Sequence, residues 1–197
     1  MSTIPTPSSP IDEATDQASP ACVMSFNASD ASGAAGLAGD VATIAAMGAH
    51  ALPVVTTILM RDTAEIFDHS PIDADTVVEQ ARAVLEDITI AAWKVGFLGT
   101  AETVGAVAEV LSDYPDVPLV TYLPALSWMD DEDAAGAYHE ALRDLVLPLT
   151  TVLVGTPDGI GIKGTLGHDR VIRVERSEKR VVVREINYGN VGIDSEV

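Results

Sequence analysis

Small residues and aspartates follow a short apolar run near the start of the chain, in a pattern that suits ligand binding. The run covers residues 23–26, and Asp30, Gly33 and Asp40 come after it, around the start of a predicted helix at 36–48. A strand that leads through a Gly- and Ala-rich turn into a helix lets backbone N–H groups approach a small ligand closely. The stretch therefore predicts a small-molecule site, with an ordinary tight turn between strand and helix as the alternative.

One arginine stands at the end of a predicted strand, where its charge can meet a ligand. Residues 50–60 are rich in β-branched side chains, which predicts a strand, and Arg61 follows directly. A guanidinium has five N–H donors and no acceptor, so it suits a carboxylate or a phosphate. Arg61 therefore predicts an anionic ligand. The alternative is a solvated cation paired with Asp62 or Glu65.

A second cation, Lys94, lies near the end of a predicted strand at 88–95. Asp30 and Asp40 are both candidate partners, and the sequence leaves the choice between them open. Asp40 also falls near the expected first turn of the helix at 36–48, where a carboxylate suits the helix dipole. We therefore expect Lys94 to form a buried salt bridge with one of these two aspartates.

The composition predicts one folded domain in the cytoplasm. The chain has 197 residues, 47% of them hydrophobic, and no apolar run approaches the roughly 20 residues that a membrane span needs. The first 20 residues lack the basic start and apolar middle of a signal peptide. The single cysteine, Cys22, excludes an intrachain disulfide and is expected to be a buried structural thiol. The four histidines, expected at the surface or at helix caps, have no metal-ligand spacing.

The charge is strongly acidic and unevenly distributed. The net charge is −19, with 4 Lys and Arg against 24 Asp and Glu in residues 1–160, and 7 against 6 in residues 161–197. Such a surface repels nucleic acid and anionic membranes. The sequence therefore predicts neither as a partner. Residues 130–133 are four acidic residues in a row, which are expected to be a solvated helix start rather than a cation site.

Strands and helices alternate along most of the chain, which favours a mostly parallel α/β sheet with helices on both faces. A hairpin is predicted from residues 171–175 and 180–186. The chain is divided into a flexible leader at 1–20, a core at 21–156, and a Gly-rich loop, hairpin and tail at 157–197. The expected strands lie at 21–26, 50–60, 88–95, 118–123 and 150–154, and the helices at 36–48, 73–85, 101–111 and 130–146.

Three segments resemble the hydroxymethylpyrimidine and phosphomethylpyrimidine kinases of thiamine biosynthesis, in the ribokinase-like superfamily. Residues 27–40 resemble their Ser-Asp-x-x-Gly-Gly-Ala-Gly signature, 93–99 their Lys-Ile-Gly-Met-Leu segment, and 147–154 a later core strand. The resemblance implies a ribokinase-like three-layer sandwich and a pocket at the carboxyl ends of the strands. It implies these substrate-binding residues: Ala28, Asp30, Gly33, Arg61, Lys94, Gly96, Phe97 and Pro124. Lys163 is the implied nucleotide-binding residue.

The chain departs from the family pattern at several positions. The family has Gln- or Glu-Asn-Thr, whose first residue recognises the pyrimidine, where this chain has Arg61 and the two residues after it. Leu123 replaces a strand-end Asp, and no Gly-Thr-Gly-Cys or Gly-Ser-Gly-Cys anion hole occurs. The sequence therefore favours a relative without phosphoryl transfer that binds a pyrimidine-like or anionic small molecule or forms oligomers. The alternative is an active kinase that uses ATP and Mg²⁺.

The predicted C-terminal hairpin bears on assembly. A sheet edge left open invites pairing with another chain. Residues 171–186 either cover such an edge or pair across a two-fold axis. On this ground the sequence predicts a homodimer.

Overall fold

The computed structural model describes residues 19–33, 35–155, 171–177 and 180–186 of the chain. Nearly all of the expected leader, the Gly-rich loop with Lys163, and the tail after residue 186 lie outside these residues. None of the described helices is long and apolar enough to cross a membrane.

A single eight-stranded sheet forms the centre of the molecule, with the strand order β3-β2-β1-β4-β5-β6-β7-β8. Pairing is parallel from β2 to β7, and β3 and β8 are antiparallel at the two edges. The mostly parallel sheet predicted from the sequence is therefore confirmed. The strands are β1 (Cys22–Asp30), β2 (His50–Arg61), β3 (Ile66–Pro71), β4 (Ala92–Val95), β5 (Leu119–Leu123), β6 (Val152–Gly155), β7 (Val171–Ser177) and β8 (Arg180–Ile186).

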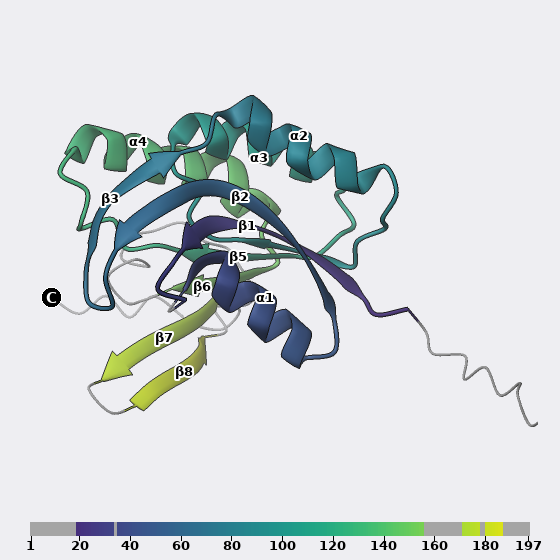
Figure 1. Cartoon of the computed structure of the whole chain (residues 1–197), viewed down its shortest axis with the longest axis horizontal. Coiled ribbons are helices and arrows are strands. Elements are labelled where there is room, and N and C mark those ends of the chain that lie inside the picture. The colour runs from purple at the N-terminus through teal and green to yellow at the C-terminus, as the bar shows by residue number, and fades with distance from the viewer. Residues whose placement is uncertain (1–18, 34, 156–170, 178–179, 187–197) are drawn as a thin grey trace, which may run out of the picture.

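Helices lie on both faces of the sheet, as Figure 1 shows, so the architecture is the expected three-layer sandwich. Helix α1 covers one face, and α2, α3 and α4 lie together on the other. Side-chain caps begin the last three helices, from Asp73, Thr100 and Asp131, each accepting from a backbone N–H of the first turn. The helices are α1 (Gly36–Ala46), α2 (Ala74–Leu85), α3 (Ala101–Ser112) and α4 (Glu132–Ala141).

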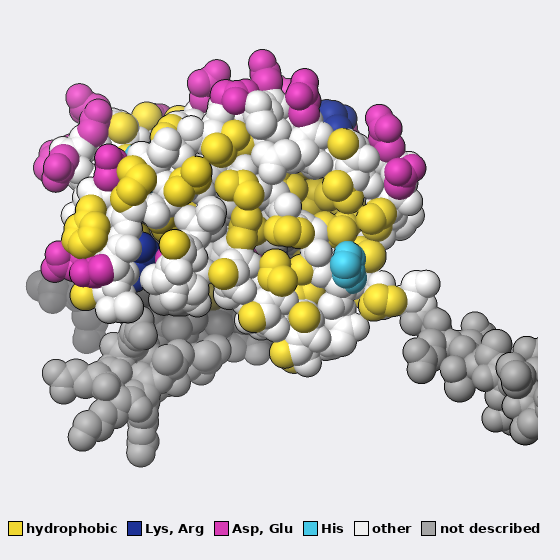
Figure 2. Space-filling view, in the orientation of Figure 1, with side chains coloured by type: hydrophobic (Ala, Val, Ile, Leu, Met, Phe, Trp, Pro, Cys, Tyr) yellow, Lys and Arg dark blue, Asp and Glu magenta, His cyan; other side chains and the backbone are white. Residues whose placement is uncertain are grey.

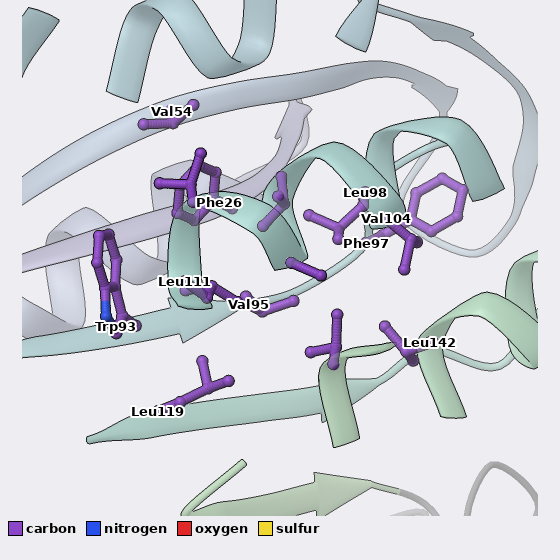
Figure 3. Packing of buried hydrophobic residues seen from close by; sticks show 14 of the residues in the cluster. Phe26, Val54, Trp93, Val95, Phe97, Leu98, Val104, Leu111, Leu119 and Leu142 are labelled. Carbon is purple, nitrogen blue, oxygen red and sulfur yellow. The ribbon is translucent and has the colours of Figure 1, made fainter. Parts of the chain in front are cut away.

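The core lies between the sheet and the layer formed by α2, α3 and α4. Figure 3 shows Phe26 and Trp93, from neighbouring strands, packed close to Leu111 of α3. Trp93 is 1% exposed, and its ring meets Phe26 at 5.9 Å and Tyr114 at 5.6 Å between centroids. Burial of such a side chain contributes about 1.5–3 kcal/mol. This packing fixes the strand ends from which the candidate site is built.

Some elements differ from those expected. Strand β3 was not predicted, because its side chains are mostly exposed and its three apolar residues do not alternate with the polar ones. It exists because Asp62 builds the turn after β2, accepting from the backbone N–H groups of Ala64 and Glu65. The helix expected at 130–146 is α-helical only as far as Ala141. A π-helical turn follows to Val146, and then a 3₁₀ turn to Leu149. Cys22, expected to be buried, is only half-buried.

The C-terminal hairpin is present as predicted, with β7 and β8 paired antiparallel from Val171–Ile186 to Ser177–Arg180. Strand β7 also pairs with β6 in parallel, so the hairpin extends the central sheet and β8 becomes the outer strand. The homodimer expected from this edge stays a prediction.

Candidate functional site

A cavity of about 770 Å³ opens where the strand order reverses. From β1 the chain continues to β2 on one side and later to β4 and β5 on the other, so the loops after β1 and β4 diverge. Open α/β sheets bind ligands in the crevice at such a point, beyond the carboxyl ends of the strands. The wall includes Ala28 from β1, Arg61 from β2, Phe97 after β4 and Pro124 after β5.

Helix α1 begins at the wall of this cavity, and its start requires a glycine. Gly36 has φ +65°, in the region that favours glycine, and a Cβ there would lie 2.5 Å from the carbonyl oxygen of Ala28. The end of β1 and the first turn of α1 therefore approach each other as backbone against backbone. This contact is the tight packing of strand against helix that the sequence analysis gave as the alternative, and the approach of this turn to a ligand stays a prediction.

Arg61 is paired with Asp30 rather than with the side chains of Asp62 or Glu65. Its Nη1 lies 3.4 Å from Oδ2 of Asp30, and its Nε donates to the backbone carbonyl of Asp62 at 2.9 Å. The Asp30 side chain is fully buried, and its Oδ1 accepts from the backbone N–H and the hydroxyl of Ser32 at 2.9 and 2.6 Å. Asp30 is therefore fixed by Ser32, and its partner Arg61 lines the cavity.

Asp40 is the partner of Lys94, which decides the alternative that the sequence left open. Its Oδ2 accepts from Lys94 Nζ at 2.7 Å, from Ser25 Oγ at 2.7 Å and from Asn27 Nδ2 at 2.9 Å. Burial lowers the pKa of Lys94, and the Asp40 carboxylate opposes that shift. Helix α1 starts at Gly36 as expected, and Asp40 lies just beyond its first turn, where its carboxylate pairs with Lys94.

Asn27 joins three elements at the centre of the site. Its Oδ1 accepts from the backbone N–H groups of Ala28 and Phe97 at 2.9 and 3.0 Å, while its Nδ2 donates to Asp40. A Cβ on Gly96 would collide with the Asn27 amide, so the glycine leaves room for this bridge. Sequence reasoning gave Asn27 no role; the available signal was an amide directly after the strand predicted at 21–26.

Aromatic rings form one side of the cavity. Phe97 and Trp128 both line it and meet edge to face, with centroids 5.6 Å apart and planes at 84°. His69 of β3 is half-buried and lies 5.4 Å from each of these two rings, a packing contact for which the sequence analysis gave no expectation. Trp128 therefore both packs against its neighbours and forms part of the cavity wall.

The residues predicted from the sequence take different places around the cavity. Asp30 is the ion-pair partner of Arg61, and Gly96 lies against the amide of Asn27. Gly33 is exposed in the turn after β1. Among the described residues, no cluster of three His, Cys, Asp or Glu side chains is placed to hold a metal ion. Of the substrate-binding residues predicted from the sequence, five line the cavity: Ala28, Arg61, Lys94, Phe97 and Pro124.

Tyr138 supports the loop that carries Phe97, and its removal gives a testable effect. The backbone N–H of Leu98 donates to the Tyr138 hydroxyl at 3.0 Å, and Tyr138 is 1% exposed. Tyr138→Phe leaves this N–H without a partner, so we expect the free energy of unfolding to fall by about 1–3 kcal/mol in urea denaturation. Tyr114→Phe is the matched control and is expected to change it by less than about 0.5 kcal/mol. An equal effect of the two variants would contradict this role.

Most of the elements that form this site lie in a segment that matches a known protein family. The family model described as phosphomethylpyrimidine kinase matches residues 30–173, which include the loop after β1 and strands β2 to β6. The chain belongs to the phosphomethylpyrimidine kinase family. This confirms the resemblance inferred from the signature around Asp30 and the segment around Lys94.

Curated relatives in this family are bacterial kinases. The chain is 33% identical over 142 residues to the hydroxymethylpyrimidine/phosphomethylpyrimidine kinase of Mycobacterium leprae, covering 72% of this chain and 51% of that protein. It is 31% identical over 146 residues to the enzyme of the same name from Streptomyces coelicolor, covering 74% and 54%. The chain thus spans about half the length of the curated relatives it matches.

Solved structures of the family and its neighbours share the fold. The phosphomethylpyrimidine kinase of Clostridium difficile superposes with a TM-score of 0.70 at 22% identity, covering 86% of this chain and 82% of that one. The pyridoxal kinase of Staphylococcus aureus, in complex with AMP-PCP and pyridoxal, gives 0.71 at 20% identity, covering 87% and 69%. At this identity the likeness establishes the ribokinase-like fold.

Proposed function

We propose that this chain is a small-molecule-binding member of the phosphomethylpyrimidine kinase family, located in the cytoplasm, whose ligand is a pyrimidine-like ring. The observation that carries the proposal is the cavity, which runs beside α1 from Val23 and Ala92, near the starts of β1 and β4, to the carboxyl ends of the strands. Its wall combines the rings of Phe97 and Trp128 with a small number of polar groups, which is the usual make-up of a small-molecule site.

The charges around the cavity favour binding over phosphoryl transfer. Transfer from ATP depends on cations and Mg²⁺ that neutralise the phosphates. Among the described residues that line the cavity, the two cations are Arg61 and Lys94, and each is paired with a carboxylate. Lys94 is held by a short ion pair with Asp40, and Arg61 alone supplies too little positive charge to neutralise a triphosphate, so we assign the cavity to a smaller ligand.

An active ATP-dependent kinase is the second candidate. It is supported by the curated relatives, which are kinases at 31–33% identity over nearly three quarters of this chain. The two candidates differ in one property, because only the kinase binds and turns over nucleotide.

Titration calorimetry with the full chain separates them. The ligands are 4-amino-5-hydroxymethyl-2-methylpyrimidine, its phosphate ester and the corresponding 5-carboxylate, followed by ATP with Mg²⁺. We expect at least one of the pyrimidines to bind and to raise the stability by about 2.7 kcal/mol at a hundred times its Kd. ATP with Mg²⁺ is expected to give no binding and no phosphorylated product. Turnover of the hydroxymethyl compound would establish the kinase instead, and failure of every pyrimidine to bind would remove the proposal.

A further inference from the structure

The guanidinium of Arg61 has most of its hydrogen-bonding capacity unused. One of its five N–H groups donates to the carbonyl of Asp62 and another faces Asp30, and the other three have no partner among the described residues. The side chain is only 13% exposed and lines the cavity. None of the Arg61 nitrogens is among the buried side-chain atoms without a partner, so the unused donors face the open cavity, where an acceptor on a ligand can replace water.

The pairing with Asp30 does not satisfy this arginine. Charge-assisted N–H···O bonds are usually about 2.7–2.9 Å long. Lys94 and Asp40 reach 2.7 Å, whereas Arg61 and Asp30 stand 3.4 Å apart. Asp30 also directs its other oxygen to Ser32. Lys94 is thus held by a short ion pair, and Arg61 is the cation in the described part of the wall whose ion pair is long.

We propose that Arg61 binds an anionic substituent, a carboxylate or a phosphate, carried by the aromatic ring that occupies the cavity. The inference rests on the proposed binding function and names the class of ligand. The planar fork of a guanidinium binds two oxygens of such a group at once. A neutral aminopyrimidine edge, which both donates and accepts, finds only donors on this side chain.

The surroundings of Arg61 are compatible with an anion in spite of the acidic chain. Figure 2 shows the Asp and Glu side chains gathered over the helical layer of α2, α3 and α4, at the top of the view, with a smaller group at the left near the turn between β2 and β3. The surface over β2 and α1 is mostly apolar or uncharged in the same view. Edge-to-face rings at Phe97 and Trp128 give the ligand ring an apolar surface in the same cavity.

Binding of three ligands that differ only at ring position 5 tests this inference. We expect the carboxylate, the phosphate ester or both to bind wild-type protein about tenfold or more tightly than the neutral hydroxymethyl compound. Arg61→Gln is expected to abolish the difference, and Arg61→Lys to retain part of it because the charge remains without the fork. Arg82→Gln removes an exposed cation paired with Asp113 and is expected to leave all affinities unchanged.

The variants are designed so that misfolding does not decide the result. Arg61→Gln leaves Asp30 buried without a cation, so Asp30→Asn combined with Arg61→Gln provides a neutral pair, and thermal unfolding is recorded for each protein. Preference for the carboxylate alone identifies an acid, and preference for the phosphate ester identifies a phosphorylated ring. The inference would be overturned if the neutral and anionic rings bound equally tightly, or if inorganic phosphate bound as tightly as the anionic rings. The proposed function would survive either result, because a ring would still bind. No binding by any ring overturns both.

Discussion

Asp40→Ala is expected to lower the free energy of unfolding by about 2–4 kcal/mol, measured by urea denaturation at neutral pH. One oxygen of Asp40 accepts from Lys94, Ser25 and Asn27, so the substitution leaves three donors without their acceptor. Removing one partner of a fully buried ion pair costs about 3–5 kcal/mol, and the lower figure used for Asp40 allows for the partial exposure of both side chains.

The loss is expected to depend on pH in a defined direction. Burial lowers the pKa of Lys94 in the folded protein, and loss of Asp40 removes the carboxylate that opposes this shift. The unfolded chain then binds the proton more readily, so stability rises with pH between the folded pKa of Lys94 and its unfolded value. The difference between Asp40→Ala and wild type should therefore be greatest near neutral pH and should shrink as the pH approaches 10.

A paired replacement provides the control for Asp40. Asp40→Leu combined with Lys94→Met removes both charges and fills the space with apolar atoms, so it is expected to recover much of the lost stability. If the double variant is as unstable as Asp40→Ala, the ion pair is not the source of the effect. Asp40→Asn keeps an acceptor oxygen and should fall between alanine and wild type.

Gly96→Ala is expected to lower the free energy of unfolding by about 3–5 kcal/mol and to weaken ligand binding. The added Cβ meets the amide of Asn27, which must move. That amide is the acceptor for the backbone N–H groups of Ala28 and Phe97, both buried. Chemical denaturation measures the loss, and calorimetry with the pyrimidine that binds best measures the affinity.

Two further variants show whether the collision with Asn27 is the cause. Gly136→Ala lies in α4 with nothing within 4 Å of the new Cβ, and it is expected to raise the stability by up to about 1 kcal/mol. Asn27→Ala combined with Gly96→Ala removes the collision, so its cost should be less than the sum of the two single variants. Strict additivity would show that Gly96 acts without Asn27.

The order of strands and helices was predictable because it depends on local pattern. The alternation of β-branched runs with amphipathic segments gave strands β1, β2, β5 and β6 and three of the four helices close to their positions. Strand β3 was not predictable in this way, since an exposed edge strand carries no apolar alternation, and its existence depends on a turn built by Asp62. The change from α-helix to a π-helical turn after Ala141 was likewise not predictable from the spacing of apolar residues.

Within the candidate site, the sequence by itself determined which chemical groups were available: a small-residue turn, two cations and the aspartates that can pair with them. Only the tertiary structure decided the pairing, giving Asp40 to Lys94 and Asp30 to Arg61. It also brought His69 against Phe97 and made Asn27 a bridge across 70 residues of chain. The physical reason is that hydrogen bonds and ion pairs depend on separations of a few ångström. These separations are set by strand register and by packing across the sheet, and the chain encodes them only through the whole fold.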